Sequence, residues 1–201
     1  MKYLLILAAY LIGSIPMAIV VARAFGLPDP RTTGSNNPGA TNILRYGGKT
    51  AAALTLAGDV LKGVVAVLLV RYVTDDPQVI ALGGAAVFLG HLYPAFFGFQ
   101  GGKGVATALG VWLVLMPSVG GLLLLTWLAV AAAFRYSSLA ALVAALAAPV
   151  YVRLLDGAGV YIALAAGMAV FLFWRHRRNI RNLLDGTEGR IGAKASSAAD
   201  R

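Results

Sequence analysis

Cysteine is absent from the 201-residue sequence, which excludes disulfide bonds and thiolate metal sites. Charge is also scarce: Asp, Glu, Lys and Arg make up 12% of the chain, about half the share usual in a soluble domain. A chain with so little charge cannot cover a water-facing surface. Glu188 is the only glutamate. Paired acids for general acid–base catalysis are therefore missing, and no side chains have the spacing of a metal-ligand cluster.

Hydrophobic residues make up 59% of the chain, and the mean hydropathy is +0.78. Several apolar runs approach the roughly 20 residues that a helix needs to cross a bilayer. The sequence predicts an all-α, polytopic transmembrane bundle of about seven spans in one domain, residues 1–193, and a disordered basic tail, residues 194–201. Pro16 is expected to kink the first span. Because several runs are short, five spans with re-entrant segments are the alternative. The predicted spans are residues 3–25, 50–72, 78–97, 104–116, 119–134, 138–154 and 159–174.

Basic residues are concentrated on one side of the predicted bundle. With seven spans, 13 of the 17 Lys and Arg residues lie in segments that share one face. By the positive-inside rule this face is cytosolic, which places the N-terminus outside and the C-terminus in the cytosol. Topology and anionic ligands therefore explain the net charge of +9, and no nucleic acid partner is expected.

The segment Gly98–Thr107 reads GFQGGKGVAT and precedes an apolar run. Glycines allow successive backbone N–H groups to converge on one anion, and a helix that begins there adds the positive end of its dipole. With Lys103 as a point charge, the pattern predicts a phosphate-binding loop. It is not a Walker A motif, because Phe97 and Gly104 stand where that motif requires Gly and Ser or Thr. A plain turn between two helices is the alternative.

Two further polar segments are predicted on the same face. One is Gly34–Asn42, closed by Arg45, and the other is Arg175–Asn182, followed by Leu184–Glu188. Cationic and neutral hydrogen-bond donors dominate both segments. A site built from them is expected to bind anions, including more than one phosphate.

Several of these polar residues also have a purely structural interpretation. Asp59 and Lys62 have i,i+3 spacing, which predicts a pair that neutralises itself inside the bundle. His91 is expected to be a structural hydrogen-bonding residue, and Asn36 and Asn42 also suit turns. The arginines that could anchor a helix end to anionic lipid are Arg175, Arg177 and Arg178.

Taken together, the motifs resemble the bacterial acyl-phosphate-dependent glycerol-3-phosphate acyltransferases of the PlsY type. The resemblance covers nearly the whole chain. It rests on GSIP in the first helix, DPRTTGSNNPGATNILRYGGK, DVLKG, GHLYPAFFGFQGGKGVAT, YSSL and RHRRNIRNLLDGTE. The second and fourth of these motifs are long and specific.

The resemblance implies a multi-pass enzyme of the bacterial inner membrane with a cytosolic active site. It would transfer a fatty acyl group from acyl phosphate to the 1-hydroxyl of sn-glycerol 3-phosphate, giving lysophosphatidic acid and phosphate. This is the first acylation of bacterial phospholipid biosynthesis. The expected partners are these substrates, membrane lipids, and two functionally coupled enzymes: one that forms acyl phosphate and a 1-acylglycerol-3-phosphate acyltransferase. No cofactor and no metal are expected.

The motifs and the resemblance together predict the site residues. Catalytic roles are predicted for Lys103, His176 and Ser35, and a chiefly structural role for Glu188. The predicted substrate-binding residues are Arg45, Asn36, Asn42, Gly101, Gly102, Gly104, Ser138 and Asn179.

The general base and the class of function each have an alternative. Without a carboxylate base, the acceptor hydroxyl could lose its proton to His176 or to the phosphate of glycerol 3-phosphate, and the phosphate is preferred.

The alternative function is a transporter for phosphate or a phosphorylated metabolite. Transporters usually show repeated halves and helices broken at the midplane. Here no internal repeat is apparent, and the polar groups cluster at one face.

Overall fold

The computed structural model describes residues 2–192, so the predicted disordered tail over residues 194–201 lies outside the described residues. Within 2–192 the chain forms helices and loops and no β-strand. The elements are α1 (Lys2–Gly13), α2 (Met17–Ala24), α3 (Ala40–Tyr46), α4 (Gly48–Val73), α5 (Pro77–Leu92), the 3₁₀ helix η1 (Ala95–Phe97), α6 (Val105–Leu115), α7 (Pro117–Phe134), α8 (Ser137–Leu154), α9 (Gly159–Arg175) and α10 (Arg177–Leu184).

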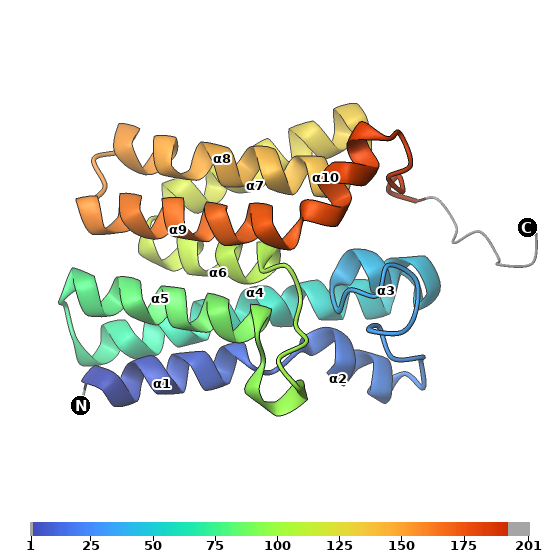
Figure 1. The fold of residues 1–201 in the computed structure, drawn as a ribbon. Coiled ribbons are helices and arrows are strands. Elements are labelled where there is room, and N and C mark those ends of the chain that lie inside the picture. The colour runs from blue at the N-terminus through green and yellow to red at the C-terminus, as the bar shows by residue number, and fades with distance from the viewer. Residues whose placement is uncertain (1, 193–201) are drawn as a thin grey trace, which may run out of the picture.

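The long helices pack side by side in two layers with α6 between them (Figure 1). One layer contains α1, α4 and α5, and the other contains α7, α8 and α9. Figure 1 also shows α2, α3 and α10 gathered at one end of the bundle, whereas α1 begins at the opposite end. The short helices α2, α3 and α10 therefore share one end of the bundle. The single domain over residues 1–193 stays a prediction.

The first apolar run is broken where Pro16 was expected to kink it. α1 ends at Gly13 and α2 begins at Met17, and the two axes differ by 41°. Proline has no N–H to donate to the preceding turn, so a helix cannot continue unchanged through it. α1 also packs in direct backbone contact with α5, because a Cβ at Gly13 would collide with the main chain at Val87.

The number of spans is less definite than the sequence predicts. Among the residues that the structure describes, four helices (α4, α5 extended by η1, α7 and α8) are long and apolar enough to cross a membrane, and the number rises to six if two bent pairs count as one span each. α6, which contains 11 residues, is only about 16 Å long, against about 30 Å of hydrocarbon. A membrane-embedded helical bundle is thus supported, and seven spans stay a prediction. The exposed leucines of α7 suit contact with lipid; they include Leu122, Leu124, Leu125 and Leu128.

The C-terminal segment turns back onto the end of the bundle. α9 and α10 meet at an angle of 62° around His176. The chain beyond α10 then reaches the turn between α7 and α8, where the N–H of Ile191 donates to the carbonyl of Arg135 at 2.7 Å. This return places the third polar segment beside the other two.

Candidate active site

Asn42 organises the first polar loop. Its side chain is buried and donates to the carbonyls of Pro30 at 3.0 Å and Thr33 at 2.9 Å. Its Oδ1 accepts the N–H of Ser35 at 2.9 Å. Gly34 adopts φ +64°, and a Cβ there would collide with Asn42 Oδ1. Asn42 therefore fixes the backbone that carries Ser35, with every polar atom of its amide already engaged.

The glycine loop is held from its carbonyl side. Arg175 donates from Nη2 to the carbonyl of Gly101 at 2.6 Å and from Nε to that of Gly102 at 3.1 Å. The N–H of Gly102 donates to the carbonyl of His91 at 3.1 Å, so it does not face an anion. Gly104 has φ +89° and is the N-cap of α6. The anion-binding groups that the loop offers are thus the N–H groups in the first turn of α6.

A chain of side-chain hydrogen bonds links Lys103 to the C-terminal segment. Lys103 Nζ donates to Asn179 Oδ1 at 2.6 Å, and Asn179 Nδ2 donates to Glu188 Oε1 at 2.7 Å. Ser138 Oγ donates to the same carboxylate oxygen at 2.6 Å. Asn182 Nδ2 lies 3.3 Å from Glu188 Oε2. The only glutamate of the chain therefore orients residues from α8 and α10 and, through Asn179, the ammonium of Lys103.

The surroundings of Lys103 lower the pKa of its ammonium group. Burial lowers the pKa of Lys103 to about 8, and the positive charges of Arg45 and Arg175 act in the same direction. The negative charge of Glu188 opposes them. Lys103 remains mostly protonated at neutral pH, and the anion of a substrate phosphate would raise its pKa again.

His176 lies buried at the junction of α9 and α10. Its Nδ1 is 2.8 Å from the carbonyl of Leu172, and a carbonyl can only accept, so the ring proton sits on Nδ1. Burial, followed by the charge of Lys103, lowers the pKa of His176 to about 4. The ring is therefore neutral at pH 7.

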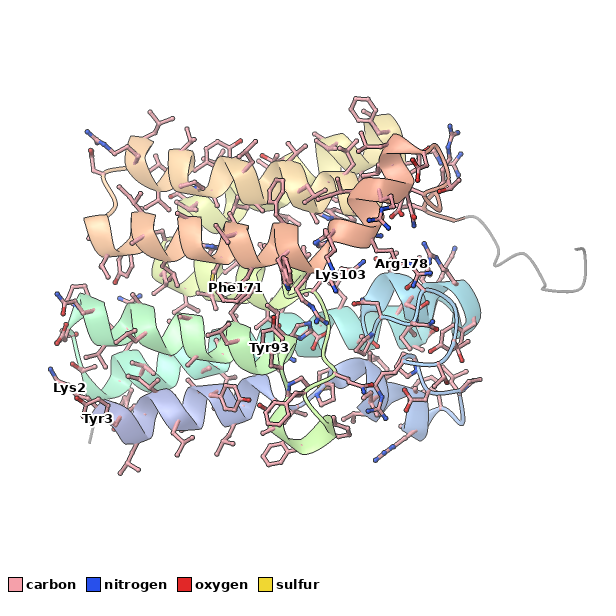
Figure 2. All side chains as sticks on the ribbon, in the orientation of Figure 1. Lys2, Tyr3, Tyr93, Lys103, Phe171 and Arg178 are labelled. Atoms are coloured by element: carbon pink, nitrogen blue, oxygen red, sulfur yellow. The ribbon has the colours of Figure 1, made fainter. Side chains whose placement is uncertain are left out.

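A cavity of about 330 Å³ joins these groups to the apolar interior between the helices. Figure 2 shows Lys103 between the two layers of helices and Arg178 further toward the end of the bundle that lies away from Lys2 and Tyr3. Polar lining residues at that end include Ser35, Arg45, Lys103, Ser138, His176, Asn179 and Glu188. Apolar lining residues include Trp112, Leu123, Trp127, Ala148, Met168 and Leu172.

The structure brings most of the predicted site residues together, although three do not line the cavity. Asn36 is exposed with φ 55°, and its neighbour Asn37 lines the cavity instead. Gly101 and Gly102 are buried behind the loop surface, where they contact Arg175. The remaining predicted residues line the cavity: Ser35, Asn42, Arg45, Lys103, Gly104, Ser138, His176, Asn179 and Glu188. Their individual roles stay predictions.

Three contributors were underestimated from the sequence. The sequence predicts Arg175 as a possible lipid anchor, but its guanidinium is half-buried against the glycine loop and lies over the ring of Tyr93, 5.6 Å from the centroid. Asp59 and His91 form part of the cavity wall. The predicted Asp59–Lys62 pair is confirmed, with Nζ and Oδ1 2.9 Å apart. A charged pair inside an apolar helix is the sequence signal that pointed to this region.

Fold and site together define a class: helical proteins with helices apolar enough to cross a membrane and a cavity that joins a cation-rich end to an apolar interior. The comparisons then give the family. The model of the glycerol-3-phosphate acyltransferase family matches residues 3–186. The chain belongs to the glycerol-3-phosphate acyltransferase family, as its motifs predict.

Relatives and solved structures agree with this assignment. Glycerol-3-phosphate acyltransferase of Methylococcus capsulatus is 54% identical, over 96% of this chain and 98% of the relative. The glycerol-3-phosphate acyltransferase of Burkholderia lata is 58% identical, over 96% of this chain and 92% of the relative. The crystal structure of PlsY (YgiH), an integral membrane glycerol 3-phosphate acyltransferase, in its glycerol 3-phosphate form superposes with a TM-score of 0.91 at 40% identity, covering 95% of this chain and 96% of that chain. The crystal structure of its lysophosphatidic acid form superposes with a TM-score of 0.89 at 39% sequence identity, covering 95% of this chain and 95% of that chain. The prediction of an acyltransferase is confirmed, and the transporter alternative is dropped.

The pKa of Lys103 leads to a pH-dependent prediction. Because the protonated lysine carries the useful charge, kcat/KM should fall as pH rises through about 8. Glu188→Gln retains an acceptor for Asn179 but removes the negative charge that raises the pKa of Lys103. The alkaline limb of kcat/KM should therefore move to lower pH in this variant. An alkaline limb that stays in place would show that Glu188 does not act on the charge of Lys103.

Proposed function

We propose that this protein transfers a fatty acyl group from acyl phosphate to the 1-hydroxyl of sn-glycerol 3-phosphate, giving 1-acyl-sn-glycerol 3-phosphate and phosphate. Its family supports the reaction class. The observation that carries the proposal is the cavity itself, which joins a cationic end at Lys103 and Arg45 to an apolar end deep among the helices. The first suits phosphate and the second suits an acyl chain.

In the proposed step, the oxygen of the 1-hydroxyl attacks the carbonyl carbon of acyl phosphate. A carbon–oxygen bond forms there, and the bond from that carbon to the phosphate oxygen breaks. Phosphate leaves with the bonding electrons. The hydroxyl proton passes to a phosphate oxygen of glycerol 3-phosphate. Lys103 and the first turn of α6 stabilise the negative charge that develops on the leaving phosphate. Arg45 binds the other phosphate, that of glycerol 3-phosphate.

Lys103→Ala tests this assignment. One lost preorganised electrostatic contact lowers the rate by about 10²–10³-fold. The measurement is phosphate release from acyl phosphate, dependent on glycerol 3-phosphate, by purified protein. Lys49→Ala is the matched control, because Lys49 is exposed on the same side of the predicted membrane and does not line the cavity. Near wild-type turnover by a monodisperse Lys103→Ala protein would remove Lys103 from the mechanism.

The apolar part of the cavity runs along α8. Ser138 and Ala148 both line it and, at the helical rise, lie about 15 Å apart along the axis. We propose that the acyl chain extends from the cationic end toward Ala148, with its carbonyl beside Lys103. Residues near Ala148 would then limit the length of chain that fits.

Ala148→Leu should therefore change chain-length preference. The added side chain fills the deep end of the cavity, so kcat/KM should fall for long-chain acyl phosphates and change little for short ones. Val143→Leu is the control, since Val143 is on the exposed side of α8. The measurement is kcat/KM over a series of acyl phosphates. Equal losses for all chain lengths would place the acyl chain elsewhere.

For the cellular setting, we propose an inner-membrane protein with seven spans and the site facing the cytosol. The chain would accept acyl phosphate from a separate enzyme that forms it and pass its product to a second acyltransferase. The excess of Lys and Arg at the end with the site supports this orientation.

Because the chain lacks cysteine, single cysteines can report the orientation. Thr32→Cys lies at the end with the site, and Asp75→Cys lies in the α4–α5 turn at the other end; both positions are exposed. A membrane-impermeant maleimide should label Asp75→Cys in intact spheroplasts and Thr32→Cys only after lysis. The reverse pattern would invert the proposed topology.

A further inference from the structure

Three buried ionisable residues lie beside the site without a role in the transfer itself. Asp59 and Lys62 come from α4 and His91 from α5, and each is at most 6% exposed. Such groups are costly inside a membrane bundle and are retained where they contribute to function. The position of this trio, directly behind the glycine loop, suggests which function that is.

Lys62 is the centre of the trio. Its Nζ lies 2.9 Å from the carbonyl of Ile15, 2.9 Å from Asp59 Oδ1 and 2.8 Å from His91 Nδ1. An ammonium donates and cannot accept, so Nζ donates to the Ile15 carbonyl and to His91, while Asp59 Oδ1 is its ion-pair partner. Nδ1 of His91 therefore accepts, which leaves the ring proton on Nε2. One lysine thus ties the α1–α2 break to α4 and α5 and fixes the orientation of the imidazole.

His91 in turn supports the glycine loop. Its carbonyl accepts the N–H of Gly102 at 3.1 Å. Its ring lies so close to Gly102 that a Cβ there would collide with Nε2. The same Cβ would lie 2.9 Å from the carbonyl of Pro38, in the first polar loop. The loop that carries Lys103 and the loop that carries Ser35 therefore meet at this imidazole.

We propose that Asp59, Lys62 and His91 are positioning residues for the phosphate pocket. Lys62 locks the ring of His91, and the ring sets the separation between the glycine loop and the first polar loop. That separation determines where Lys103 and the first turn of α6 stand relative to Ser35 and Arg45. The inference rests on the proposed function only in taking this pocket to bind phosphate.

The first test is a double-mutant cycle at the contact between His91 and Gly102. His91→Asn keeps an acceptor for Lys62 where Nδ1 stood, but leaves a gap under the loop. Gly102→Ala adds a Cβ where the ring now stands. Each single variant should raise the inhibition constant of inorganic phosphate about tenfold. The double variant should lose less affinity than the sum of the two single losses, because the ring that the methyl group would meet is gone and only the contact with the Pro38 carbonyl remains. Additive losses would overturn the proposal.

The second test separates positioning from bundle stability. Asp59→Leu alone leaves Lys62 buried without its counter-ion and should lower Tm strongly. Adding Lys62→Met removes that unpaired charge, and apolar replacement of a buried pair is often neutral for stability. Tm should therefore recover in the double variant, while the inhibition constant for phosphate stays about tenfold above wild type. If both Tm and the inhibition constant for phosphate return to wild-type values, Asp59 and Lys62 only stabilise the bundle, and the proposal is overturned.

The two proposals fail separately. If the wild-type protein transfers the acyl group and both tests come out negative, only the positioning role is lost. If the wild type shows no transfer, the proposed function is lost. The affinity for phosphate can then be measured as the ligand-induced shift in Tm, which still decides the positioning role.

Discussion

An excess of positive charge at one end of the bundle is the constraint on which the site depends. Lys103, Arg45 and Arg175 lie around it, and the described residues that line the cavity include two carboxylates, Glu188 and Asp59, of which Asp59 is paired with Lys62. Most of the cations are held by neutral acceptors: main-chain carbonyls for Arg175 and an amide oxygen for Lys103. Neutral acceptors satisfy hydrogen bonds without cancelling charge. A substrate phosphate can neutralise this positive charge, so its binding also lowers the repulsion among the cations.

Broken helices build the pocket at this end. The break between α1 and α2 frees the carbonyl of Ile15, and Lys62 satisfies it. The bend between α9 and α10 turns His176 inward and carries Asn179 toward Lys103. Irregular backbone at membrane depth is tolerated where protein groups pair it or where it lines a cavity. Here both conditions hold, and the cost of each break is offset by a contact that also shapes the site.

The sequence predicted those features that local pattern decides. Apolar runs located the long helices, and i,i+3 spacing placed Asp59 beside Lys62. It could not predict the direction of side chains that meet across long separations: Arg175 reaches a loop more than 70 residues away. It also could not distinguish Asn42, whose buried side chain in α3 binds the preceding loop, from exposed Asn36, because both belong to one polar segment of the sequence. α6 begins after its N-cap, Gly104, and ends at the Met116–Pro117 turn, and a hydropathy pattern does not locate these two boundaries.

The same positive charge bears on the proton transfer. It makes the pocket favourable for phosphate, and it also opposes protonation of a histidine there. Burial, followed by the charge of Lys103, lowers the pKa of His176 to about 4, so the ring is neutral yet a poor proton acceptor. A phosphate monoester, with a second pKa of about 6, is the stronger base of the two. It also arrives covalently attached to the hydroxyl that must lose its proton, so no enzyme group has to be positioned for that task. With Nδ1 committed to Leu172, His176 is better suited to orient a substrate oxygen through Nε2 than to remove a proton.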